Sequence, residues 1–163
     1  MTDWILLFIR EVSFTIWLGG LIAIDCIETP SRFRTPELTR AQAVAVGRRV
    51  FAAFNRVEIF LGLLVLSSTL PLVLREDAAR GAGSFHGRAS VICVCLMLLP
   101  ALAQLLKLRP RLTELSRTLD LAKQDRSGPL FAEMRRLHQA YIASDILKIA
   151  AGLVALGFRS LAR

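Results

Sequence analysis

The amino-acid sequence predicts an all-α integral membrane protein built as a bundle of four transmembrane helices. The 163 residues are 54% hydrophobic yet 21% charged, and their mean hydropathy is +0.51, which is more apolar than a typical soluble domain. The charged residues collect between four apolar runs. Each run has roughly the 17 to 25 residues that a membrane-crossing helix needs.

The four apolar runs cover residues 4–27, 57–74, 89–108 and 141–158. Inside a bilayer every backbone polar group needs a partner within its own segment, so each run is expected to be a helix. Asp3 stands where a signal peptide would have a basic segment, and no small-residue cleavage site follows the first run. We expect this run to be a retained anchor.

Helices 2, 3 and 4 are expected to extend into the cytoplasm, over residues 39–56 and 109–140. Pro30 and Pro36 predict a short break after the first helix, because proline disfavours a continuing helix. The last helix is expected to start at Pro129, since proline is tolerated in a first turn. Beyond the third run, apolar residues at steps of three or four indicate an amphipathic helix, namely Leu108, Leu112, Leu115, Leu119 and Ala122. Residues 1–163 are expected to form a single domain.

Basic residues are concentrated on one side of the predicted bundle. The segments between helices 1 and 2 and between helices 3 and 4 hold 14 of them, namely Arg32, Arg34, Arg40, Arg48, Arg49, Arg56, Lys107, Arg109, Arg111, Arg117, Lys123, Arg126, Arg135 and Arg136. The other side holds six, namely Arg10, Arg75, Arg80, Arg88, Arg159 and Arg163. The positive-inside rule therefore predicts cytoplasmic basic loops and both termini outside the cytoplasm. The net charge of +8 is interpreted as an orientation signal and an attraction to anionic headgroups, not as nucleic-acid binding.

The last apolar helix carries ionisable side chains on one face. A charge inside a bilayer costs on the order of 3 kcal/mol even on the lenient insertion scale, so these side chains need partners. Steps of three and four residues bring the helix-4 groups together, and depth along the helices places them opposite polar groups of helices 1 and 2. The predicted polar pocket consists of Asp25, Asn55, Glu58, His138, Tyr141, Asp145 and Lys148.

Three interpretations fit this pocket. In a closed network, Asp145 pairs with Lys148, and Glu58 pairs with Lys148 or a loop arginine, because buried charges are normally paired. Alternatively, the groups line a water-filled vestibule for a proton, a cation or a small polar solute, since intramembrane ionisable residues often mark such pathways. A metal ion held by the carboxylates and His138 has no supporting ligand spacing. We favour the closed network and predict no metal site.

No catalytic motif is present. The sequence lacks a Gly-rich phosphate loop, a Gly-x-Ser-x-Gly elbow and a His-Glu-x-x-His pair, so we predict neither catalytic residues nor an enzyme. The two histidines, His86 and His138, are expected at opposite membrane faces, about 30 Å apart, which disfavours a haem shared between them. No cofactor is predicted, and the alternative is a single histidine ligand to haem or chlorophyll.

The three cysteines lie within apolar runs and are interpreted as small packing residues. Cys93 and Cys95 are two residues apart, so on a helix they point to nearly opposite sides. We predict neither a disulfide nor a zinc site from them or from Cys26.

Several short motifs resemble a bacterial four-helix membrane family of unknown function that is related to transmembrane protein 205. They are Trp17-Leu18-Gly19-Gly20 with Pro30 and Phe33, then Val50-Phe51-Ala52-Ala53-Phe54 with Asn55 and Glu58, and finally Phe131 to Gly152 with Leu137-His138. The resemblance implies four transmembrane helices in a bacterial inner membrane and no assigned chemistry. The chain is also similar to copper-resistance-D-like proteins and the bacterial membrane protoporphyrinogen oxidase. However, helix 1 has no histidine, and three Met and two His are few for a copper route.

Two functional expectations follow for this chain. The first is an integral membrane protein without catalytic chemistry, acting as an accessory or interaction subunit or as a permeation unit for small solutes or ions. Its expected contact surface for a second copy or another membrane protein comprises Leu112, Leu115 and Leu119. The second expectation is a haem- or pigment-binding component of a membrane oxidoreductase. The small residues Gly19, Gly20, Gly62 and Gly152 are expected to permit close helix approach.

Overall fold

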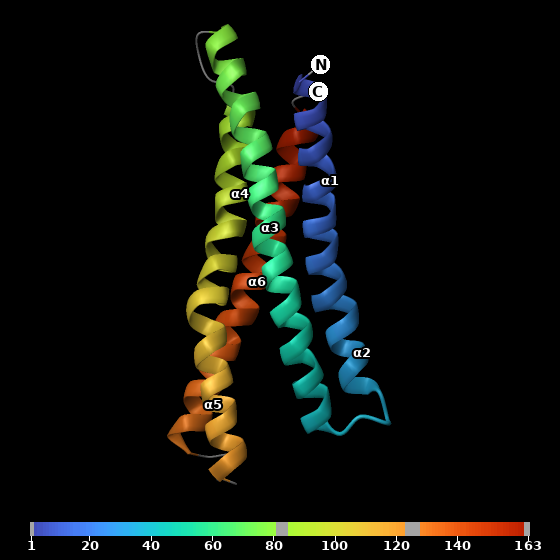
Figure 1. Ribbon diagram of the computed structural model, residues 1–163, viewed down its shortest axis with the longest axis vertical. Coiled ribbons are helices and arrows are strands. Elements are labelled where there is room, and N and C mark those ends of the chain that lie inside the picture. The colour runs from blue at the N-terminus through green and yellow to red at the C-terminus, as the bar shows by residue number, and fades with distance from the viewer. Residues whose placement is uncertain (1, 81–84, 123–127, 162–163) are drawn as a thin grey trace.

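The computed structural model describes the backbone of residues 2–80, 85–122 and 128–161. This part of the chain is helical except for residue 128 and a short connection at residues 35–39 (Figure 1). The elements are α1 (Thr2–Ile22), η1 (Ala23–Glu28), α2 (Thr29–Arg34), α3 (Arg40–Arg80), α4 (Phe85–Ala103), η2 (Gln104–Leu108), α5 (Arg109–Ala122) and α6 (Pro129–Leu161). The all-α prediction is confirmed, as are helix starts close to Thr39 and at Pro129.

Consecutive elements form four long rods, because η1 joins α1 to α2 and η2 joins α4 to α5 without interruption. All four rods are long and apolar enough to cross a membrane, over Asp3–Arg34, Arg40–Ala79, Gly87–Thr118 and Pro129–Phe158. The chain therefore has the helix lengths and the composition of a multi-pass membrane protein.

The rods pack as a bundle in which sequence neighbours are antiparallel. α1 packs against α3, α3 against α4, and α4 against α6, whereas α1 and α6 share a smaller contact. The two chain termini lie at the same end of the bundle as the end of α3 and the start of α4 (Figure 1). α2 and α5 lie at the opposite end. The two predicted basic loops thus share one end of the molecule.

The hydrophobic core lies along the middle of the bundle. Its largest fully buried apolar side chains are Phe14, Trp17, Leu21, Val65, Val94 and Met97. Large apolar side chains also cover the outside, where Leu99 is 63% and Ile146 is 62% exposed. A contiguous apolar exterior is unfavourable in water and is typical of a surface that faces lipid.

Two π-helical segments occur just before prolines. In η1 the N–H of Thr29 bonds to the carbonyl of Ile24, and after η2 the N–H of Arg109 bonds to the carbonyl of Gln104. Pro30 and Pro110 follow directly. Proline has no N–H and its ring crowds the carbonyl four residues earlier, so a wider upstream turn accommodates it. The predicted break after the first helix is present at residues 35–39, which include Pro36, but it does not begin at Pro30, because the helix continues through Pro30 to Arg34.

Three of the four predicted glycines lie where a side chain would collide with a neighbouring helix. A Cβ on Gly62 would lie 2.6 Å from Leu98 and 3.0 Å from the Trp17 ring, and one on Gly152 would lie 2.7 Å from Leu18. A Cβ on Gly20 would lie 2.7 Å from Phe54. Gly19 differs, because a Cβ there would have nothing within 4 Å.

Candidate functional site

Lys148 is the centre of a buried ion-pair network. Its side chain is completely inaccessible to solvent, and its Nζ lies 2.8 Å from Glu58 Oε1 on α3 and 2.7 Å from Asp145 Oδ1 on α6. Nζ also donates a 2.8 Å hydrogen bond to Gln104 Oε1 on η2. A lysine ammonium has three donors and no acceptor, so these three partners use its full capacity.

Glu58 connects this network to α1 and α4. It is 1% exposed, and its Oε1 accepts a 3.2 Å hydrogen bond from Trp17 Nε1. Its Oε2 accepts a 3.1 Å bond from Asn55 Nδ2, and the same nitrogen donates to the Ala101 carbonyl at 3.2 Å. Four rods therefore meet at one carboxylate and its immediate partners.

Gln104 bridges the two ends of the network. Its Oε1 faces the Lys148 ammonium, while its Nε2 donates to Asp145 Oδ1 at 2.8 Å. Nε2 also donates to Ser144 Oγ and, at 3.4 Å, to the Tyr141 carbonyl. Gln104 is the first residue of η2 and is completely buried, so the π-helical turn before Pro110 holds it against α6.

Among the side chains in direct contact, carboxylates outnumber ammonium groups, and Arg109 on α5 also interacts electrostatically with Glu58. Glu58 and Asp145 supply two carboxylates and Lys148 supplies one ammonium. Asp25 on η1 adds a third carboxyl group, which interacts electrostatically with all three of these side chains. Asp25 is half-buried, and its Oδ2 is buried without a hydrogen-bond donor in the described part of the chain.

The structure brings together most of the predicted polar pocket. Asn55, Glu58, Asp145 and Lys148 are in direct contact, which confirms the pairing of Lys148 with both carboxylates. Tyr141 contributes its carbonyl to Gln104, and its ring packs edge-on against Phe51 with centroids 5.7 Å apart. Asp25 lies on η1, and its Oδ2 has no hydrogen-bond partner in the described part of the chain.

His138 does not belong to the network. Its side chain is exposed, like those of its neighbours at 135, 136, 139 and 140. It shares a helical face with Tyr141 and Asp145, but it lies on the part of α6 before the packed core begins. A common face therefore does not ensure common burial. The side chain of His86 lies outside the described residues.

Two members of the network were missed from the sequence. Gln104 and Trp17 are completely buried and both hydrogen-bond to charged groups. Gln104 interrupts the apolar run 89–108, and an isolated amide in such a run is a signal that could have been used. Trp17 carries its polar N–H on an otherwise apolar ring, so composition alone does not distinguish it from a core residue.

Arg32 is also buried, at 7% exposure, although its charge was assigned to a loop. Its Nη1 donates to both carboxylate oxygens of Glu28, at 2.7 and 2.9 Å. The guanidinium lies 5.3 Å from the centre of the Phe33 ring and 6.0 Å from that of Phe51. The guanidinium of Arg32 occupies the space over Gly47, so this arginine packs α2 against α3.

The described residues contain no group of three or more His, Cys, Asp or Glu side chains placed to hold a metal ion. Among the described residues the three cysteines form no disulfide, and Cys93 is buried whereas Cys26 is exposed. The pairing of Lys148 with two carboxylates and an amide is a neutralising arrangement typical of buried charges.

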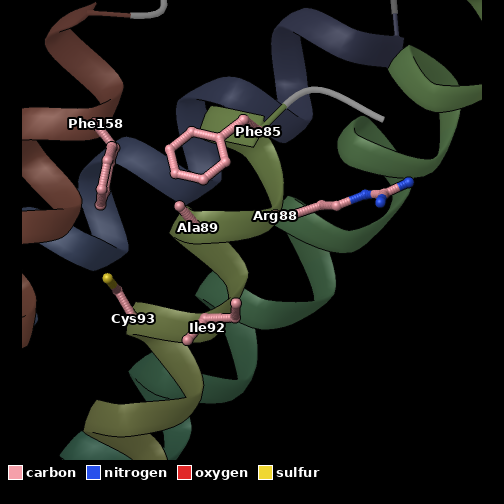
Figure 2. Close-up of a pocket in the computed structure, with 6 residues that line it drawn as sticks. All are labelled: Phe85, Arg88, Ala89, Ile92, Cys93 and Phe158. Carbon is pink, nitrogen blue, oxygen red and sulfur yellow. The ribbon is translucent and has the colours of Figure 1, made fainter. Parts of the chain in front are cut away.

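Two surface hollows formed by described residues are lined by no residue of the network. The first, of about 370 Å³, lies between α4 and α6 and is lined by Phe85, Arg88, Ala89, Ile92, Cys93 and Phe158. Figure 2 shows the two phenylalanine rings at its rim, edge to face with centroids 5.9 Å apart. The second, of about 400 Å³, is lined by Phe33, Leu38, Arg40 and Ala43.

A family model described as "Domain of unknown function (DUF4149)" matches residues 12–119. The match includes Trp17, Asp25, Asn55, Glu58 and Gln104 and ends before α6, which supplies Asp145 and Lys148. No curated protein and no solved structure matches the chain. Because the family model covers well over half of its length, the chain belongs to this uncharacterised family, the domain of unknown function DUF4149.

Proposed function

We propose that this chain is a non-enzymatic accessory or interaction subunit of a membrane, in which the Lys148 network holds the four rods in register. The main observation behind the proposal is that the side chains of the network are sealed from solvent. Lys148, Gln104 and Asn55 are completely buried, and Glu58 and Asp145 are 1% and 6% exposed. Such a constellation specifies which helices pack together.

The burial of the Lys148 network also argues against a continuous path for ions or solutes through it. A conducting path needs water or exchangeable ligands along its length, whereas all three Lys148 donors are engaged by protein. Neither described hollow reaches the network. Permeation would require the ion pairs between α3 and α6 to separate.

The expected contact surface on α5 needs revision. Leu115 is 2% exposed, so it packs within this chain. Leu112 is half-buried, and the side chain of Leu119 lies outside the described residues. A second copy or another membrane protein would therefore meet the outer side of α5, where Arg111 pairs with Glu114 and Glu133, rather than the predicted leucine stripe.

The proposal places the chain in a bacterial inner membrane with both termini outside the cytoplasm. Its support is the excess of basic residues at the α2–α3 and α5–α6 end, which the positive-inside rule assigns to the cytoplasm. The ends of α3, α5 and α6 at this side would then extend past the bilayer toward anionic headgroups. A relation to the transmembrane protein 205 family is part of the same proposal and rests on the Trp17-Leu18-Gly19-Gly20 motif.

Reconstitution tests the proposal against permeation. Purified protein in sealed vesicles is expected to conduct protons, Na⁺ and K⁺ no faster than empty vesicles, as followed with internal fluorescent indicators. A variant with Lys148→Met, Glu58→Gln and Asp145→Asn removes the charges together and is expected to give the same result. Flux with the native protein that disappears in this variant would overturn the accessory role in favour of permeation.

A haem- or pigment-binding oxidoreductase component is the second candidate. It needs a histidine at a pocket, and neither described hollow is lined by one. The exposed position of His138 also gives it no enclosed space for a macrocycle. An absorption spectrum of protein purified from its native membrane is expected to lack a Soret or chlorophyll band, and either band would replace the accessory role with this candidate.

A further inference from the structure

The hollow at the connection between α2 and α3 combines apolar walls with a cation. Its volume is about 400 Å³, and it is lined by Phe33, Leu38, Arg40 and Ala43. Ala43 is buried, whereas Phe33 and Arg40 are exposed. Within the described part of the chain Arg40 forms no ion pair. The hollow therefore offers a positive charge that no carboxylate of these residues neutralises.

Hydrogen bonds within the α2–α3 connection hold the rim of this hollow. The Leu38 N–H donates to the Thr35 carbonyl at 3.2 Å. Thr39 and Gln42 form a capping box, in which the Thr39 N–H donates to Gln42 Oε1 at 2.9 Å and the Gln42 N–H donates to Thr39 Oγ1 at 3.3 Å. The backbone that carries Arg40 is thus ordered without a ligand.

A buried donor without an acceptor lies one helical turn further along α3. The guanidinium of Arg32 occupies the space over Gly47, which is four residues after Ala43 and therefore on the same face of α3. Arg32 Nε is buried and has no hydrogen-bond partner in the described part of the chain. A buried polar group without a partner is costly. An anionic oxygen that enters along this face of α3 would supply the missing acceptor.

Charge and depth both favour an anionic lipid headgroup as the occupant. Residues 28–40 contain three arginines and two glutamates, a net charge of +1. Phe33 lies six residues past the end of the first apolar run at residue 27, which is about 9 Å by helical rise. The headgroup layer extends about 5–8 Å beyond the hydrocarbon core, and an arginine side chain is long enough to reach back toward it.

We propose that this hollow binds one anionic phospholipid, with the lipid phosphate at Arg40 and an acyl chain along the ring of Phe33. A guanidinium binds a phosphate through two parallel N–H bonds, which suits arginine to this role. The 51% exposed Phe33 ring places an apolar surface next to the charge, and a free inorganic phosphate would not use it. The site goes beyond the accessory role and does not depend on which leaflet this end of the bundle occupies.

Native mass spectrometry of the protein released from lipid nanodiscs tests the site. From an equimolar mixture of phosphatidylglycerol and phosphatidylcholine, the native protein is expected to retain one phosphatidylglycerol in preference. Arg40→Gln is expected to reduce this retention about fivefold, the effect of one cation near a membrane surface. Equal retention of the two lipids by the native protein would overturn the proposal.

Arg49→Gln is the matched control for the charge. Residue 49 is also an exposed arginine of α3, but it lies about two and a half turns from Arg40 and so on the opposite side of the helix. This variant is expected to retain phosphatidylglycerol as the native protein does. An equal loss in both variants would show a general attraction of basic residues and would overturn the site.

A second variant separates the hollow from the charge. Leu38→Trp enlarges a half-buried side chain that lines the hollow and keeps every arginine, and it is expected to lose the retained lipid. Retention equal to that of the native protein would show that charge alone holds the lipid. If Leu38→Trp does not fold, Phe33→Ala replaces it, because this variant removes an exposed apolar wall and is expected to weaken retention as well.

The same spectra distinguish other occupants of the hollow. Millimolar inorganic phosphate is expected to leave the retained lipid in place, and displacement would identify a site for soluble anions instead. The native protein and Arg40→Gln are expected to have the same oligomeric state. A dimer that disappears in Arg40→Gln would identify a second copy of the chain as the occupant and would overturn the lipid site.

Discussion

At the scale of single residues, the central feature is an ammonium group that is completely buried yet fully partnered. Isolated burial of a charge in an apolar medium is prohibitive, and Lys148 avoids this through two carboxylates and the Gln104 amide oxygen. Such networks contribute more to specifying one packing than to net stability. Their members should therefore respond very differently to single and to joint replacement.

Lys148→Met is expected to destabilise the protein strongly, by about 3–5 kcal/mol, because it leaves two buried carboxylates without a cation. Combining it with Glu58→Gln and Asp145→Asn is expected to recover most of that loss, since no uncompensated charge remains. Thermal unfolding in mild detergent, followed by tryptophan emission, measures both effects.

Arg111→Met provides the matched control for this comparison. It also removes a cation with two carboxylate partners, Glu114 and Glu133, but these pairs are exposed and screened by water. Its melting temperature is expected to stay close to that of the native protein. A triple variant that is no more stable than Lys148→Met would show that the network contributes net stability rather than specificity.

At the scale of the elements, close approach of helices depends on where glycines lie relative to large partners. Gly62 faces Leu98 and the Trp17 ring, and that same ring donates its N–H to Glu58. Packing and the polar network are therefore linked through one indole. Gly19 lies on the same rod as Trp17 but has open space beside it.

Gly62→Ala is expected to destabilise the bundle by about 1–3 kcal/mol, the usual cost of overpacking a core. The new methyl group would lie 3.0 Å from the Trp17 ring and would push it away from Glu58. Gly19→Ala is expected to be neutral or to stabilise by up to about 1 kcal/mol through helix propensity. Equal melting temperatures for the two variants would contradict this difference in environment.

At the scale of the whole molecule, four antiparallel rods place the two termini at one end and the basic segments at the other. Charge then determines which end faces the cytoplasm, because basic loops are retained there during insertion. Arg32 contributes less to this signal than its loop assignment suggested, since it is buried and paired with Glu28.

Cysteine labelling tests the orientation. In a background without Cys26, Cys93 and Cys95, a cysteine introduced at Ala78 is expected to react with a membrane-impermeant reagent added to intact spheroplasts. A cysteine at Arg117 is expected to react only after the membrane is opened. Both native positions are exposed at opposite ends of the bundle, and labelling of residue 117 from outside would reverse the topology.

The sequence by itself determined the four helices, their order and the pairing of Lys148 with Asp145. Hydrophobic run length, proline position and three-residue spacing are local properties, and α6 begins at Pro129 as they predict. It also identified Glu58 and Asn55 as buried polar groups, because polar side chains on an apolar helix need partners.

Only the tertiary structure decided which groups share one buried site. It excluded His138, which lies beyond the packed core, and included Gln104 and Trp17, which come from other rods. It also showed that the first helix continues through Pro30 after a π-helical turn that contains Asp25. Contacts between rods depend on how far each helix is rotated about its axis and shifted along it. The spacing of residues within one helix does not specify either quantity.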